Sequence, residues 1–233
     1  MNTQSVRLIT IAFGISLSLT PIWASAAKSK FNAVEWADAA KGKTIQFAVY
    51  KAEPHIVYTP ASAVGGGLID SMTRPDGSKI PLADTAYLLA NQLQPQLSSL
   101  VEATWSKNEE LLPLPAPKDK NIASYKTQYP ADYILEMVVP TQVLSYKPTA
   151  WATYKLQISI ESRLIDNSTG TILWKYKDRC VPTSSDGKFE IHNDEFAAND
   201  GQRLKTVLAA VVEECATLYL HDFKGEQPAK KKR

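Results

Sequence analysis

Apolar and polar residues alternate along residues 154–165, YKLQISIESRLI. A period of two is typical of a strand with one buried face. Residues 171–181, TILWKYKDRCV, repeat the pattern, and the intervening DNSTG has the residues of a tight turn. The two segments are therefore predicted to form an antiparallel hairpin. The turn also contains Asn167-Ser168-Thr169, an N-glycosylation sequon by its letters, which matters only in a eukaryotic secretory pathway.

Three further segments have the patterns of strands. Residues 132–139, DYILEMVV, are apolar on both faces, as expected of a central strand. Residues 43–50, KTIQFAVY, alternate and predict a first strand, and HIVYT at 55–59 is a second extended piece.

Two segments have the apolar spacing of amphipathic helices. The first covers residues 82–105, with Asp84 or Thr85 as its cap and with Pro95 expected to kink it or divide it in two. The second covers residues 201–223, with an alternative start near Asp194. Helices packed on one face of a mostly antiparallel sheet predict an α+β fold, a two-layer sandwich.

Residues 1–26 have the features of a cleaved signal peptide. Arg7 precedes an apolar run at 8–19, and Ala24 and Ala26 provide the small residues that cleavage requires. The alternative is a membrane anchor, but a spanning helix needs about 20 apolar residues. The mature chain is predicted to begin at Ala27 and to contain no transmembrane segment. Its predicted location is the periplasm, with an extracellular location as the alternative.

The rest of the chain is predicted to be a single α+β domain at 27–224, with a proline-rich connector near 111–118, followed by a disordered basic tail at 225–233. The sequence has 26 Lys and Arg and 24 Asp and Glu residues. Without Arg7 and the four basic residues at 230–233, 21 basic and 24 acidic residues remain, a net charge of −3. This balance argues against a nucleic acid as partner.

The glycine run in SAVGGGLID, residues 62–70, raises the question of phosphate binding. A Walker loop needs Lys and Ser or Thr directly after its last glycine, but Leu68 and Ile69 follow Gly67 here. The favoured interpretation is a bend leading into a short helix, and an anion site at that helix start is the alternative. No cofactor is predicted.

No catalytic or metal-binding residue is predicted. The segment EIHNDE groups carboxylates that hard cations prefer with a histidine, but a solvated loop with helix-capping acids is the favoured interpretation; the residues are Glu190, His192, Asp194 and Glu195. No G-x-S-x-G elbow occurs. Clustering of these groups with Asp70 or His55 in the fold would favour the alternative, a hydrolase with a carboxylate or metal site.

Tyr146, Pro148, Trp151 and Tyr154 bring three aromatic rings together between two predicted strands. Exposed aromatic residues mark binding sites, so these four are candidate partner-binding residues. The alternative is that they close the core over a strand crossover. A third hypothesis is a small apolar ligand in a cavity behind Trp151 and Trp174.

The two cysteines, Cys180 and Cys215, are predicted to form a disulfide bond. Export places them in an oxidising compartment, and no third cysteine competes. Cys180 is in phase with the inward side chains of its strand, and Cys215 lies on the apolar stripe of the last helix. The alternative is a pair of buried free thiols.

Residues 131–220 resemble a family of uncharacterised secreted proteins and lipoproteins of Gram-negative bacteria. The piece RLIDNSTGTIL is also similar to the strand–turn–strand of envelope proteins related to the curli-secretion channel and to activators of penicillin-binding proteins. The resemblance implies a small α+β domain that binds other proteins, and it carries over no catalytic residue. Unlike most such proteins, this chain has no cysteine for lipidation near the cleavage point. The expected function is a non-enzymatic accessory protein that binds a cell-envelope partner.

Overall fold

A computed structural model describes residues 31–59, 82–116, 118, 122, 125–182, 186–196 and 198–226. They belong to one compact unit, Phe31–Arg233. The predicted signal peptide, the glycine run at 65–67 with Asp70, and the basic residues at 230–233 lie outside the described residues.

The described residues form a mixed sheet of seven strands. The strands are β1 Thr44–Val49, β2 His55–Tyr58, β3 Thr104–Lys107, β4 Tyr133–Lys147, β5 Ala150–Asp166, β6 Thr171–Cys180 and β7 Glu190–His192. Their order is β3-β1-β4-β5-β6, with β2 beside β4 and β7 beside β5. The long pairings β4–β5 and β5–β6 are antiparallel, as is β5–β7, whereas β1 runs parallel to β3 and β4, and β2 parallel to β4. The predicted hairpin of β5 and β6 and the central position of β4 are confirmed.

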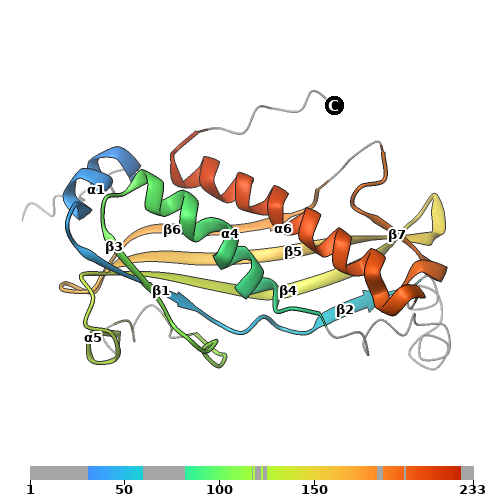
Figure 1. Ribbon diagram of the computed structural model, residues 1–233, viewed down its shortest axis with the longest axis horizontal. Helices are drawn as coiled ribbons and strands as arrows, with labels where there is room; N and C mark the ends of the chain where they lie inside the picture. The colour runs from blue at the N-terminus through green and yellow to red at the C-terminus, as the bar shows by residue number, and fades with distance from the viewer. Residues whose placement is uncertain are drawn as a thin grey trace, which may run out of the picture. The chain divides into compact units, whose positions relative to one another are not determined.

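Helices α4, Thr85–Leu100, and α6, Gln202–Phe223, lie side by side over one face of the sheet (Figure 1). The short helices are α1 Ala33–Ala40 and α5 Tyr125–Gln128, with 3-10 turns at Asn193–Glu195 and Ala198–Gly201. The α+β fold class with helices packed on the sheet is therefore confirmed. None of the helices in the described ranges is long and apolar enough to cross a membrane.

Helix α4 is shorter than the predicted 82–105, whereas α6 agrees with the predicted 201–223 to within one residue. Asp84 caps α4 by accepting hydrogen bonds from the amides of Ala86 and Tyr87. The helix continues through Pro95 undivided to Leu100, after which the chain forms β3. Helix α6 begins at Gln202 and not near Asp194. Residues 199–201 have positive φ values of 50°, 53° and 69°, and this left-handed conformation cannot continue a right-handed helix.

The sheet separates two hydrophobic cores. Because side chains alternate along β1, Phe47 and Val49 join the main core under α4 and α6, whereas Ala48 and Tyr50 point to the opposite face. That face packs against residues 112–116 and α5, and we call it the connector face. The proline-rich connector is thus part of the same packed unit, on the side of the sheet away from the long helices.

A disulfide joins Cys180 at the end of β6 to Cys215 in α6, with Cα atoms 5.8 Å apart. Both cysteines are buried in the main core, at 2% and 0% exposure. The sequence predicted this pairing because both cysteines lie on the apolar faces of their elements. The bond attaches the helix layer to the end of the β5–β6 hairpin.

Candidate partner-binding site

A groove of about 590 Å³ lies on the connector face. Its floor is made by β4 and β5, one wall by residues 114–116 and Lys118 of the connector, and the other wall by Lys175 and Lys177 of β6. Apolar side chains, among them Val138 and Pro140, line it together with charged ones. The groove therefore combines an apolar surface with fixed polar groups, the composition typical of binding sites.

The polar centre of the floor is a buried ion pair between Glu136 and Arg163. Arg163 Nε donates to Glu136 Oε1 at 2.8 Å, and Arg163 Nη2 donates to Glu136 Oε2 at 2.5 Å. Only 4% of the Glu136 side chain and 12% of the Arg163 side chain are exposed. The two residues face each other across β4 and β5 in register. This bidentate geometry fixes both side chains and neutralises the charge of the carboxylate.

Two tyrosines extend this network towards the connector. Tyr125 of α5 donates its hydroxyl proton to Glu136 Oε2, and Tyr50 is hydrogen-bonded to Tyr125, with 2.7 Å between the hydroxyl oxygens. Burial raises the pKa of Tyr50 to about 12. Burial and the Glu136 charge raise the pKa of Tyr125 further. Both hydroxyls therefore stay protonated at neutral pH and act as donors, and the network attaches α5 to the sheet.

The β6 wall is exposed and basic. Lys177 Nζ lies 2.6 Å from Glu161 Oε1, but the two side chains are 80% and 43% exposed. Arg179 donates to the side-chain oxygen of Gln157, a neutral group. Exposed ion pairs contribute at most about 1 kcal/mol, so the Lys177 contact can be exchanged for another carboxylate at little cost.

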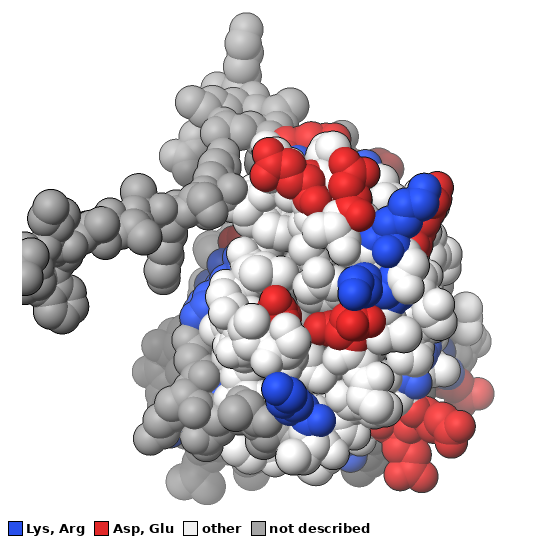
Figure 2. All heavy atoms as spheres, turned by 90° about the vertical axis from the view of Figure 1, so that its left-hand side faces the viewer, with Lys and Arg blue, Asp and Glu red and all other residues white. Residues whose placement is uncertain are grey.

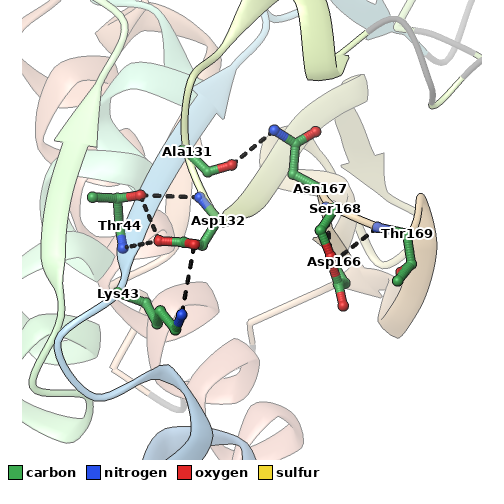
Figure 3. Close-up of polar contacts among 8 residues, drawn as sticks. All are labelled: Lys43, Thr44, Ala131, Asp132, Asp166, Asn167, Ser168 and Thr169. Carbon is green, nitrogen blue, oxygen red and sulfur yellow. Dashed lines mark hydrogen bonds and ion pairs between the residues drawn. The ribbon is translucent and has the colours of Figure 1, made fainter.

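At the end of the sheet near α1 and α5, an aspartate joins two strands (Figure 3). Asp132 Oδ2 accepts hydrogen bonds from the backbone amide of Thr44 at 2.8 Å and from its hydroxyl at 2.9 Å. Lys43 Nζ lies 3.9 Å from Asp132 Oδ1. The hydrogen bonds from Thr44, with a smaller contribution from Lys43, hold the pKa of Asp132 below its ordinary value. Asp132 thus fixes the start of β1 beside the start of β4.

The sequon in the β5–β6 turn is a structural element. Asn167 is 6% exposed, and its Nδ2 donates to the backbone oxygen of Tyr129 at 3.0 Å. It also donates to the backbone oxygen of Ala131 at 2.8 Å (Figure 3). Asp166 Oδ1 accepts from the Ser168 amide and hydroxyl. The turn therefore holds strands together.

In Figure 2, which views this end of the sheet, acidic and basic side chains are interspersed. The end of the sheet on which the turn lies therefore carries charges of both signs.

The four predicted aromatic-site residues divide between core and surface. Tyr154 is 3% exposed and packs edge-on against Phe196, and Tyr146 packs partly buried against the main core. Trp151 is 65% exposed at the tip of the β4–β5 hairpin, where its indole nitrogen donates to the backbone oxygen of Pro148 at 2.8 Å. Alternation along β5 explains this division, since it sends Tyr154 into the core.

Among the residues of EIHNDE, Glu190 is paired with lysines, whereas His192 contacts Asp194 and Glu195. Glu190 lies between Lys147 and Lys155, with Oε1 2.9 and 3.4 Å from their Nζ atoms. The hydrogen bond from Lys147 lowers the pKa of Glu190, against the effect of burial. His192 Nδ1 contacts Asp194 Oδ1 at 2.5 Å, and its backbone amide donates to Glu195. Among the described residues, no group of three His, Cys, Asp or Glu side chains could hold a metal ion.

Trp174 and Trp151 lie in different surroundings, the first buried and the second exposed. Trp174 is 7% exposed and packs edge-on against Tyr219 and Phe223, with ring centroids 5.2 and 5.0 Å away. Its indole nitrogen donates to Asp222 at 3.2 Å. The ring is therefore buried in the interface between β6 and α6, whereas Trp151 is exposed to solvent.

Sequence reasoning missed the Glu136–Arg163 pair. The only signal was a single glutamate among the apolar residues of YILEMVV, residues 133–139. A carboxylate that stays charged in a central strand is commonly paired with a buried cation. The partner could not be chosen from the sequence because several basic residues follow within the next two strands.

No protein-family model matches this chain, and no curated protein matches it. Solved structures do match. Protein XCC0632 from Xanthomonas campestris, of family DUF330, is 12% identical with a TM-score of 0.45, covering 80% of this chain and 87% of that one. A putative lipoprotein from Caulobacter crescentus is 17% identical with a TM-score of 0.34, covering 64% and 91%. The LpoB C-terminal domain from Salmonella enterica is 14% identical with a TM-score of 0.30, covering 64% and 93%. One of these matches is thus a putative lipoprotein, and the function is argued below from this chain's own residues.

Proposed function

We propose that this protein is exported to the periplasm by its signal peptide and acts there as a non-enzymatic accessory protein that binds another cell-envelope protein. The observation that carries the proposal is the groove on the connector face, with its fixed polar floor and its exposed basic wall. A surface of this kind suits recognition of a partner by shape and charge.

Three acidic side chains of the described residues have structural roles. Glu136 is held by Arg163, Glu190 by two lysines, and Asp132 by the start of β1. A carboxylate in a bidentate pair with arginine is poorly suited to exchange protons during a reaction. These pairings support a binding role over the hydrolase alternative.

The proposal is tested by capturing partners from a periplasmic extract on the tagged mature protein, residues 27–233, and identifying them by mass spectrometry. An unrelated exported protein with the same tag is the control bait. We expect one envelope protein to be enriched and, once purified, to bind the mature protein saturably in isothermal titration calorimetry. Absence of any such binder, or a location of the protein outside the periplasm on fractionation, would overturn the proposal.

A further inference from the structure

Strand β6 presents a row of cations on the connector face. Lys175 pairs in register with Arg163, whose side chain lies on that face, and the alternation of the strand puts Lys177 and Arg179 on the same side. All three residues are exposed. Alternate residues of an antiparallel strand are about 6.8 Å apart. The row therefore matches the spacing of alternate side chains in another extended strand.

The backbone beside this row faces outward. Strand β6 is the last in the path β3-β1-β4-β5-β6 of the described residues. The amide of Arg179 donates to the side chain of Asp178 at 2.7 Å, so this N–H points away from β5. Backbone groups alternate in direction along a strand, and the register is regular from Lys175 to Arg179. The amides of Lys175 and Lys177 therefore point to the same outer side of the sheet.

The charge of the row decides which strand can pair there. Lysines on an edge strand oppose pairing with neutral strands and with further copies of the same edge. A second copy of β6 would place its own Lys175 and Lys177 beside these cations, and like charges directly opposite each other are destabilising. A strand with carboxylates at alternate positions replaces that repulsion with ion pairs and competes readily with Glu161 for Lys177.

We infer that β6 is the docking edge for an extended acidic segment of the partner protein, which adds to the sheet as a further strand with its carboxylates over Lys175, Lys177 and Arg179. The inference rests on the proposed partner-binding function and names the chemistry of the partner. The backbone pairing supplies affinity that is independent of sequence, and the cation row supplies selectivity for acidic segments.

The test uses the mature protein with its disulfide intact and a labelled ten-residue peptide in which glutamate alternates with threonine. Fluorescence anisotropy should show saturable binding that weakens from 50 to 300 mM salt, because ion pairs at an exposed edge are screened. Charge reversal with Lys175→Glu and Lys177→Glu should weaken binding at least tenfold. The matched control is Lys41→Glu with Lys224→Glu, which reverses two exposed charges outside the groove and the β6 row and should leave the affinity unchanged.

Backbone pairing is tested without altering the protein. The same peptide carrying N-methyl groups at successive residues keeps its charges but loses its amide donors, and it should no longer bind. Hydrogen exchange measured by NMR should slow at the amides of Lys175 and Lys177 when the unmethylated peptide is bound. Equal binding of the methylated peptide, or of a peptide with lysine in place of glutamate, would overturn the inference.

Stronger binding to anionic lipid vesicles than to the peptide, or concentration-dependent dimerisation through β6, would also overturn it. Failure here is distinct from failure of the proposed function. An envelope partner that is captured equally well by the protein with both β6 lysines reversed would leave the proposed function standing and would remove only the assignment to β6.

Discussion

The buried ion pair on the connector face gives the sharpest test of the structure. Replacing Arg163 with methionine removes two hydrogen bonds to Glu136, at 2.8 and 2.5 Å, and leaves a carboxylate that is only 4% exposed without its cation. Removal of one partner of a buried pair costs about 3–5 kcal/mol. Because Tyr125 still donates to Glu136, we expect the lower end, about 3 kcal/mol. For a domain of this size the melting temperature should fall by roughly 6–12 °C.

The second variant removes the charge as well. In Glu136→Gln with Arg163→Met, the amide oxygen still accepts from Tyr125 and no isolated charge remains in the interior. We therefore expect this double variant to lose only about 1 kcal/mol, so that it is more stable than Arg163→Met alone.

The assay is urea unfolding of the mature protein followed by tryptophan fluorescence, with near-ultraviolet circular dichroism to verify native packing. Lys177→Met is the matched control, because the ion pair of Lys177 with Glu161 is exposed to solvent. Its loss should cost under about 1 kcal/mol. The reasoning is refuted if Arg163→Met costs no more than this control, or if the double variant is less stable than the single one.

Three further predictions concern other parts of the molecule. Neither Cys180 nor Cys215 should react with a thiol reagent in denatured, unreduced protein, and two labelled cysteines would contradict the bond. Replacing both with alanine should lower the free energy of unfolding by about 3–4 kcal/mol, since the bond closes a loop of sequence separation 35. Trp151→Ala should change the free energy of unfolding by less than about 0.5 kcal/mol, because Trp151 is exposed. Tyr154→Ala should lower it by about 3–5 kcal/mol in the same urea titration, because Tyr154 is buried. Equal losses would contradict this difference in burial. Folding lowers the pKa of Asp132, so its ionised carboxylate stabilises the fold fully above the unfolded pKa, near 4, and this contribution is lost as the pH falls through the folded pKa. Asp132→Asn should therefore lose less stability than the wild type as the pH falls below about 4. An unchanged dependence of the unfolding free energy on pH would argue against the hydrogen bonds to β1.

Local patterns predicted the elements whose signal does not depend on distant residues. The strict alternation of 154–165 and 171–181 and the DNSTG turn determine the β5–β6 hairpin, because side-chain period and turn chemistry are properties of the local chain. The apolar stripe of α6 likewise predicted which face is buried. The pattern also predicted its start to within one residue, and the left-handed residues 199–201 exclude the alternative start near Asp194.

Only the tertiary structure decided what lies on each face of the sheet. Trp151 and Tyr154 are three residues apart and equally aromatic, yet one projects into solvent and the other packs on Phe196. Glu136 and Arg163 are far apart in sequence, and only the antiparallel register of β4 and β5 places them opposite each other. The groove and the outward edge of β6 arise in the same way, because they depend on strand order. The sequence by itself determines which segments are strands and helices, through local periodicity. The register and order of the strands follow from burying both faces of one sheet at once. They determine which charged side chains lie beside the exposed backbone of β6.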